Sequence, residues 1–221
     1  MLKQRVITAV LLLAVLLPAL FASVTWPFAV LTLVLIGAAG WEWGRLNGAG
    51  RGSLAMGVGL ALVCAAALWA GWATAAPSAV WWLATAAWVL GGAWALRGGP
   101  AAWPRWSPPV RWALGLLLLW LAWLALANAR SQGINFILSV FCIVWVADIS
   151  AYFGGRAFGR RKLAPSISPG KSWEGVWSGM VGALLLAAVW LAVDRVYVVD
   201  SPSLYTHLNE RLGTGTLTVV V

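Results

Sequence analysis

The chain has 221 residues, of which 62% are hydrophobic and only 10% carry a charge. An ordinary soluble domain has about 25% charged residues, so the low charged fraction excludes that class. The mean hydropathy of +0.87 excludes it as well. The formal net charge of +9 does not indicate nucleic-acid binding, because no soluble domain carries it. The sequence therefore predicts an integral membrane protein with membrane lipids as its surroundings and with no nucleic-acid partner.

Apolar runs of membrane-spanning length recur along the chain, and strict alternation typical of a transmembrane barrel is absent from them. Since a hydrocarbon core of about 30 Å takes roughly 20 helical residues, each run predicts a transmembrane helix. We expect spans near residues 6–22, 26–44, 54–75, 78–96, 112–129, 133–153 and 173–193, and a further apolar run begins at Thr214. The predicted fold class is all-α: a polytopic membrane helical bundle of about seven complete transmembrane helices plus the start of an eighth, with residues 1–221 as a single membrane domain.

The basic residues fall mainly in alternate loops, which orients the chain because Lys and Arg accumulate on the cytoplasmic side of short loops. The predicted cytoplasmic segments hold Lys3, Arg5, Arg45, Arg51, Arg97, Arg105, Arg111, Arg156, Arg160, Arg161, Lys162 and Lys171, whereas the opposite side holds Arg130, Arg195 and Arg211. We therefore predict a multi-pass protein of the inner (plasma) membrane with a cytoplasmic N-terminus and a basic cytoplasmic loop over residues 154–172. In the first three loops, orientation alone explains the charge.

Neither the cysteines nor the single histidine forms a pattern typical of a metal site. Cys64 and Cys142 lie singly in apolar spans, and His207 has no second histidine or nearby cysteine, so packing explains them best. The 18 tryptophans gather near predicted span ends and indicate an interfacial aromatic belt or packing rather than a cofactor site.

Carboxylates inside membrane spans are more informative, because such a charge needs a partner or a water-filled cavity. Asp148 interrupts an apolar span on its predicted cytoplasmic third, and Tyr152 and Arg156 follow at helical spacing on the same face. These three side chains predict a polar strip that opens toward the cytoplasm, with a structural Asp–Arg pair as the alternative. Glu42 lies three residues before Arg45, a spacing that indicates a local ion pair.

The segment APSISPGKSWEG, residues 164–175, follows the basic cluster and leads into the last complete span. Ser168 is a candidate helix cap and Pro169 suits a first helical turn, so the backbone amides up to Ser172 and the Lys171 side chain predict an anion site at a helix N-terminus. Beyond it, Gly175, Gly179 and Ala183 recur every four residues, which predicts close packing on a neighbouring helix. A phosphate-binding P-loop is rejected, because that motif needs glycine where Pro165 stands.

Residues 147–175, ADISAYFGGRAFGRRKLAPSISPGKSWEG, resemble the cytoplasmic loop of the phosphatidate cytidylyltransferases, also called CDP-diacylglycerol synthases. The Asp-x-x-Ala-Tyr-Phe-x-Gly-Arg element and the Ser-Pro-x-Lys-(Ser/Thr)-x-Glu-Gly element occur at the family's separation. The resemblance implies transfer of a cytidylyl group from CTP to phosphatidate, giving CDP-diacylglycerol and pyrophosphate in phospholipid biosynthesis, with Mg²⁺ as cofactor.

This chemistry suits the residues of the loop. An ionised phosphate needs no general base to attack, so cations and a metal must neutralise and align two anions. The expected catalytic residues are Asp148, Lys171 and Glu174, and Asp148 is the expected metal ligand. The expected substrate-binding residues are Tyr152, Arg156, Arg160, Arg161, Lys162, Ser168 and Ser172. We expect Lys171 and Ser168 to bind nucleotide phosphates and Glu174 to hold Lys171 or the cytosine-ribose end of the nucleotide.

Other classes of function remain as alternatives. A CTP-dependent lipid-alcohol kinase has a similar loop, whereas a transporter would place polar groups at mid-membrane in paired helix breaks. A non-catalytic scaffold would leave Asp148 and the Pro-Gly-Lys turn without a role. The sequence leaves the oligomeric state open, with a homodimer as one arrangement.

The resemblance also raises an expectation about the end of the chain. The family carries a further cytoplasmic motif that is rich in Asp and contains a His-Gly-Gly element, and no segment here matches it. After Glu174 the remaining carboxylates, Asp194, Asp200 and Glu210, are expected on the opposite side of the membrane. We therefore expect a truncated piece of a longer enzyme that is inactive alone.

Overall fold

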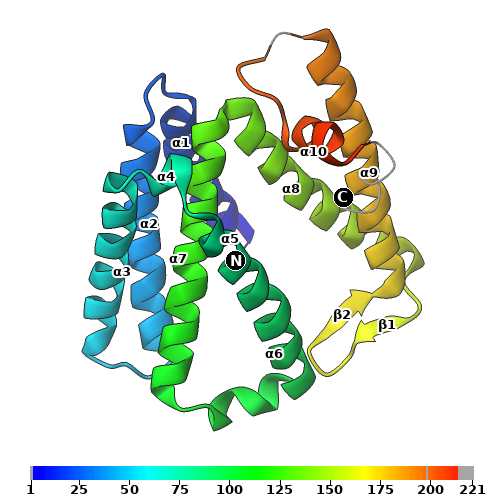
Figure 1. Ribbon diagram of the computed structural model, residues 1–221. Coiled ribbons are helices and arrows are strands. Elements are labelled where there is room, and N and C mark those ends of the chain that lie inside the picture. The colour runs from blue at the N-terminus through cyan, green and yellow to red at the C-terminus, as the bar shows by residue number, and fades with distance from the viewer. Residues whose placement is uncertain (1, 198, 214–221) are drawn as a thin grey trace. The chain divides into compact units, whose positions relative to one another are not determined.

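The computed structural model describes residues 2–197 and 199–213, with the side chains of residues 2–6, 8 and 9 left out. The helices are α1 (Leu2–Phe21), α2 (Trp26–Leu46), α3 (Gly52–Trp69), α4 (Trp72–Ala75), α5 (Ser78–Ala86), the π-helix η1 (Ala87–Gly91), α6 (Gly92–Gly98), the 3-10 helix η2 (Pro100–Arg105), α7 (Pro108–Gln132), α8 (Ile134–Phe158), α9 (Trp173–Val196) and α10 (Leu204–Leu212). Strands β1 (Lys162–Ala164) and β2 (Ser168–Ser172) form an antiparallel hairpin between α8 and α9 (Figure 1).

Six helical segments are long and apolar enough to cross a membrane, which confirms the predicted all-α polytopic class. They are Trp26–Leu46, Gly52–Trp69, Ser78–Gly98, Pro108–Gln132, Ile134–Phe158 and Trp173–Val196. The first predicted span lies on α1, whose apolar part, Val10–Phe21, is shorter than these six. The start of the eighth span, from Thr214, lies outside the described residues.

The third predicted span, residues 54–75, is too long at its C-terminal end. Helix α3 ends at Trp69, and Gly71 adopts a left-handed conformation with φ 78° before the short helix α4 begins. A residue without Cβ adopts this conformation at little steric cost, so α3 ends at Trp69, six residues earlier than hydropathy indicates.

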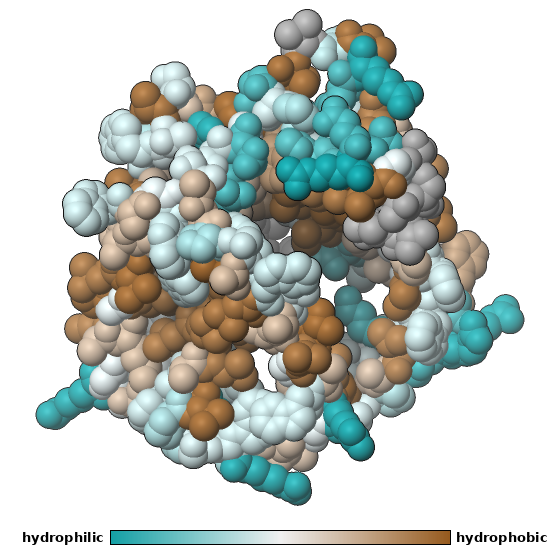
Figure 2. Space-filling model, viewed as in Figure 1, coloured by the Kyte–Doolittle hydropathy of each residue, from teal (hydrophilic) through white to brown (hydrophobic). Residues whose placement is uncertain are grey.

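Exposed apolar side chains are concentrated on the spanning helices, as expected for surfaces that face lipid. Figure 2 shows hydrophobic side chains over the helical surfaces and long hydrophilic side chains projecting near helix ends. Val34 and Leu62, for example, are 65% and 64% exposed. This pattern is the reverse of a soluble domain and agrees with a bilayer as solvent.

The chain forms two compact units, residues 1–131 and 132–221. In the first unit, α3, α5 and α7 share an apolar core that includes Leu60, Cys64, Val80 and Leu124. At the end of α2, the Asn47 side chain accepts a hydrogen bond from Trp103 Nε1 at 3.1 Å, and its backbone carbonyl accepts one from Trp112 Nε1 at 3.0 Å. These two tryptophans thus pack within the protein, so an interfacial belt alone does not explain them.

In the second unit, small residues let α8 and α9 approach each other closely. Gly175, Gly179 and Ala183 are all buried, which confirms the predicted packing face. A Cβ on Gly175 would lie 2.9 Å from the carbonyl oxygen of Ala151, and one on Gly179 would lie 3.1 Å from that of Ala147. Both contacts involve backbone atoms, so these positions accept little beyond a hydrogen atom.

At the opposite end of these helices, the segment after α9 caps the start of α8. The Asp200 carboxylate accepts hydrogen bonds from the backbone amides of Ile134, at 2.5 Å, and Asn135, at 2.9 Å. Asp194 accepts from Thr206 Oγ1 at 2.6 Å and from the Ser203 amide at 3.0 Å. Asp194 and Asp200 therefore satisfy backbone and side-chain donors at this end of the unit.

A substitution at Gly154 tests the close packing of α8 on α9. A Cβ at Gly154 would overlap the side chain of Ser178, so Gly154→Ala should lower the free energy of unfolding by about 1–3 kcal/mol. Gly59→Ala in α3 is the matched control, because a Cβ there meets nothing within 4 Å and helix propensity favours alanine by about 1 kcal/mol. Thermal unfolding in detergent measures both, and an unchanged or raised Tm for Gly154→Ala would contradict this packing.

Candidate functional site

A cavity of about 770 Å³ opens between α8, the β1–β2 hairpin and the start of α9. Its lining comprises Ala151, Tyr152, Gly155, Arg156, Leu163, Ser168, Gly170, Lys171, Ser172, Gly175 and Val176. Five of the predicted substrate-binding or catalytic residues are thus brought together: Tyr152, Arg156, Ser168, Lys171 and Ser172. The cavity is the candidate functional site.

One wall of the cavity comes from α8. Tyr152 and Arg156 lie one turn apart, and Arg156 Nη1 donates a hydrogen bond to the Tyr152 hydroxyl oxygen at 3.3 Å. The predicted strip on this helix face is confirmed for these two residues. Because both side chains are exposed, the guanidinium keeps donors free for a further acceptor.

Asp148 lies one turn before Tyr152 on α8 but is not among the residues that line the cavity. Its side chain is exposed, and it has no ion pair or hydrogen bond within the part of the chain that the structure describes. The alternative of a structural pair between Asp148 and an arginine is therefore not found there.

The hairpin forms the second wall and corrects the predicted helix start. Residues Ser168–Ser172 are strand β2, with Lys162 opposite Ser172 and Ala164 opposite Ser168. The helix begins at Trp173, and the N-cap is Ser172, whose Oγ accepts a hydrogen bond from the Gly175 amide at 3.2 Å. The predictions of Ser168 as the cap and of Pro169 in the first turn are wrong, because pairing with β1 keeps these residues extended.

Because residues 168–172 form a strand, the loop offers a different kind of anion site from the predicted helix N-terminus. The amides of Gly170 and Lys171 are not the first free donors of a helix, as predicted, but belong to an extended strand beside the cavity. Lys171 Nζ is exposed and has no ion-pair partner among the described residues. Lys171 and Arg156 bring positive charge to the cavity through their side chains.

Glu174 fastens the base of the hairpin. Its carboxylate accepts hydrogen bonds from the backbone amides of Arg160 and Arg161 at 3.1–3.3 Å and lies 3.6 Å from Arg161 Nε. The Trp173 amide donates to the Arg161 carbonyl oxygen at 2.9 Å, which closes the same connection. The prediction that Glu174 holds Lys171 is not supported by these contacts, since the carboxylate is occupied on the β1 side.

The remaining predicted residues do not line the cavity and are exposed: Arg160 and Arg161 lie between α8 and β1, and Lys162 is the first residue of β1. The sequence missed the apolar wall of the cavity, formed by Ala151, Leu163 and Val176. Leu163 stands out in retrospect as an apolar residue between a basic cluster and a turn. Val176 carries no such signal, because it resembles any residue of a spanning helix.

A group of three or more His, Cys, Asp or Glu side chains that could hold a metal is not found among the described residues. A single free carboxylate, Asp148, nevertheless fits the way proteins commonly hold Mg²⁺, with one or two carboxylates, several waters and the phosphates of a substrate. The residues present therefore suit a metal that arrives with a nucleotide.

A model of the cytidylyltransferase family matches residues 3–219. The chain belongs to the cytidylyltransferase family. Family membership confirms the predicted enzyme class, a nucleotidyltransferase, and the predicted resemblance over residues 147–175 lies inside the matched region.

Named relatives agree with the family. A phosphatidate cytidylyltransferase of Pseudomonas aeruginosa is 40% identical over 193 residues, which cover 81% of this chain and 67% of the relative. Phosphatidate cytidylyltransferases of Haemophilus influenzae and Rickettsia bellii are 43% and 38% identical over 89 and 87 residues, which cover 31% and 38% of those relatives. The matches thus span from about a third to two thirds of the relatives' length. No solved structure matches the chain.

Replacing Glu174 tests whether this cytidylyltransferase needs its carboxylate to hold the hairpin. Glu174→Gln removes the charge and one of the two acceptor oxygens, so the hairpin base should open more often and trypsin should cut after Arg160, Arg161 or Lys162 several times faster. Mass spectrometry of the fragments identifies the cut sites. Glu210→Gln, at an exposed position of α10, is the control. Equal cleavage of Glu174→Gln and the unaltered protein would mean that the strand pairing alone holds the hairpin.

Proposed function

We propose that this protein transfers a cytidylyl group from CTP to phosphatidate, forming CDP-diacylglycerol and pyrophosphate, and that the cavity between α8, the hairpin and α9 binds the reacting phosphates. The observation that carries the proposal is the lining of one cavity by Tyr152, Arg156, Ser168, Lys171 and Ser172. Membership in the cytidylyltransferase family and the name shared by its relatives support the reaction.

Charge is the main obstacle to this reaction. CTP carries about four negative charges, and the phosphate of phosphatidate carries nearly two at neutral pH, since its second pKa lies near 6. The phosphate oxygen of the lipid attacks the α-phosphorus and pyrophosphate leaves, so no proton has to be removed first. The protein's task is to bring two anions into line and to neutralise them.

Lys171 and Arg156 suit this task because they approach the cavity from opposite walls, β2 and α8. The hydroxyl groups of Ser168 and Tyr152 add donors for phosphate oxygens. The side chain of Ser172 is already used as the cap of α9, so we assign it the role of positioning the helix start rather than contacting substrate.

One wall of the cavity is apolar, in contrast to the basic side chains on its other walls. Ala151, Leu163 and Val176 provide a surface without charge next to the basic side chains. A lipid phosphate has this composition, with a charged head joined to an apolar body. We propose that phosphatidate lies with its glycerol end on this wall and its phosphate toward Lys171.

We further propose that Mg²⁺ takes part, held by Asp148 together with phosphate oxygens of the nucleotide. When bound, the metal neutralises phosphate charge. Asp148 is suited to the role because its carboxylate is exposed and unpaired in the described part of the chain, one turn from Tyr152. Glu174 is a poorer ligand, since its oxygens accept hydrogen bonds from backbone amides.

Labelled CTP tests the reaction and its site together. With phosphatidate present, the proposal expects label from the α-position of CTP in the lipid phase, whereas transfer from the γ-position would identify the alternative, a CTP-dependent lipid kinase. Lys171→Ala should lower kcat/KM by about 100-fold, because it removes one fixed cation at the reacting phosphates.

Two variants serve as controls in the same assay. Lys162→Ala removes a cation of the same hairpin that does not line the cavity, and Arg97→Ala removes one from α6 in the first unit. Both should keep most of the activity. Equal losses in Lys171→Ala and Lys162→Ala would mean that the hairpin acts through its total charge and not through the cavity.

We also propose that the protein crosses an inner membrane several times. The hairpin and the cavity then face the cytoplasm, where CTP is available. The charge asymmetry of the loops supports this orientation. A homodimer stays a prediction, which the mass of the detergent-solubilised protein measures.

Site-directed labelling tests the orientation. In a background with Cys64 and Cys142 replaced, Ser166→Cys in the hairpin turn should react with a membrane-impermeant maleimide only after the cells are opened. Glu210→Cys on α10 should react from outside intact cells. Labelling of Ser166→Cys in intact cells would reverse the orientation and remove the access of the cavity to CTP.

A further inference from the structure

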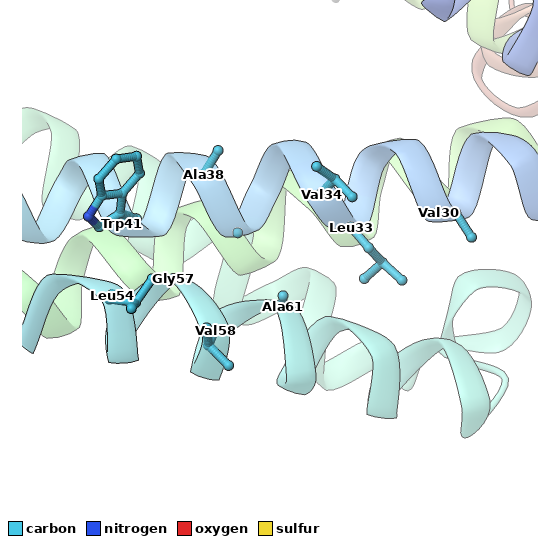
Figure 3. A pocket seen from close by; sticks show the side chains of 10 residues that line it. Val30, Leu33, Val34, Ala38, Trp41, Leu54, Gly57, Val58 and Ala61 are labelled. Carbon is cyan, nitrogen blue, oxygen red and sulfur yellow. The ribbon is translucent and has the colours of Figure 1, made fainter.

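A second hollow lies in the first unit, between α2 and α3, and is made of different residues from the candidate active site. It is a groove of about 380 Å³ lined by residues from Val30 to Trp41 on α2 and from Leu54 to Ala61 on α3. Figure 3 shows α2 and α3 side by side, with the labelled side chains projecting from both helices. Apart from Trp41, the lining side chains are aliphatic or absent.

Missing side-chain volume explains why the groove exists. Gly37 and Gly57 face each other, since a Cβ on Gly57 would overlap the carbonyl oxygen of Gly37 and come 2.9 Å from the backbone nitrogen of Trp41. Ala38 and Ala61 add little volume on either side, whereas Val34 and Val58 project outward as the walls and are 65% and 52% exposed. A hollow with exposed apolar walls on a membrane-spanning pair faces lipid rather than water.

The length of the groove matches one leaflet of a bilayer. From Val30 to Trp41 the helix rises by about 16 Å, at 1.5 Å per residue. Half of a hydrocarbon core of about 30 Å is about 15 Å. One acyl chain of a lipid in that leaflet can therefore lie along the whole groove.

Positive charge lies at the Trp41 end of the groove. The Arg45 guanidinium carbon lies 5.2 Å from the centre of the Trp41 ring, and Arg51 begins the turn into α3 at the same end. Glu42 pairs with Arg45 at 3.4 Å and offsets one of the two charges. Arg51 is exposed and has no ion pair in the described structure, so the end keeps a net positive charge.

We propose that the α2–α3 groove binds one anionic phospholipid, with an acyl chain along the glycine-lined gap and the phosphate between Arg45 and Arg51. Trp41 lies at the boundary between the two parts of the ligand, where tryptophan is favoured in membrane proteins. Charge complementarity selects a lipid over a helix of another protein, because an apolar helix would bring no counter-charge for Arg51, whose guanidinium has no ion pair in the described structure. The site lies wholly in the first unit and does not depend on the proposed reaction.

Titration of the delipidated full chain in neutral detergent with phosphatidylglycerol, followed by native mass spectrometry, tests the proposal. The protein should retain one phosphatidylglycerol and bind phosphatidylcholine more weakly. Ala38→Leu should weaken binding about tenfold by filling the groove. Arg51→Gln should weaken binding about fivefold, in line with one basic residue near an anionic headgroup.

Matched controls separate the groove from general effects. Ala66→Leu adds the same side chain to an exposed position of α3 that does not line the groove, and Arg97→Gln removes a cation from α6. Both should bind phosphatidylglycerol as the unaltered protein does, and all variants should show the same Tm without lipid. Lys171→Ala should also keep this binding, which distinguishes the groove from the reaction site.

Three results would overturn the proposal. Equal retention of both lipids would remove the role of the arginines, and undiminished binding by Ala38→Leu would place the lipid elsewhere. A dimer that Ala38→Leu dissociates would assign the groove to a second copy of the chain. Competition by inorganic phosphate alone, without any effect of Ala38→Leu, would reduce the site to an exposed anion contact.

Discussion

The close approach of α8 and α9 is the constraint on which the candidate active site depends. Gly175 and Gly179 place backbone against backbone, at positions where a Cβ would meet the carbonyl oxygens of Ala151 and Ala147. The residues that connect these two helices form the β1–β2 hairpin, and Arg156 on α8 and Lys171 on β2 line one cavity. Larger residues at the glycines would move one wall of the site away from the other.

Glu174 gives that hairpin a fixed base. A carboxylate that accepts two backbone amides acts as a structural clamp, and the same contacts occupy the oxygens that a metal would need. Asp148 shows the opposite arrangement, with an exposed carboxylate that lacks a partner in the described structure. The two acidic residues of the loop region thus differ in what they can do, although the sequence assigns both to catalysis.

The surrounding lipid determines which side chains can line both proposed sites. Because lipid surrounds the spanning helices, apolar walls are available at no cost in exposure to water, and specificity has to come from the few charges at helix ends. The cavity of the second unit is lined by Leu163 and Val176 as well as by Lys171. The groove of the first unit is lined by Val34 and Val58, with Arg45 over the ring of Trp41 at one end and Arg51 at the start of α3. An apolar surface beside a cation suits a phospholipid in each case.

The sequence by itself determined the membrane class, most of the spans, the small-residue face of α9 and the family. The thickness of the bilayer requires apolar runs of a set length, and close contact between helix backbones requires small residues, so both features can be read from residue type. It also brought Tyr152 and Arg156 together, since helical spacing alone fixes that pair. Only the tertiary structure decided that Ser172 and not Ser168 caps α9, that Glu174 binds the amides of Arg160 and Arg161, and that Leu163 lines the cavity. These three features follow from the pairing of β1 with β2. Two short polar strands have no hydrophobic alternation from which their register can be read, and in a hairpin the geometry of the turn sets it.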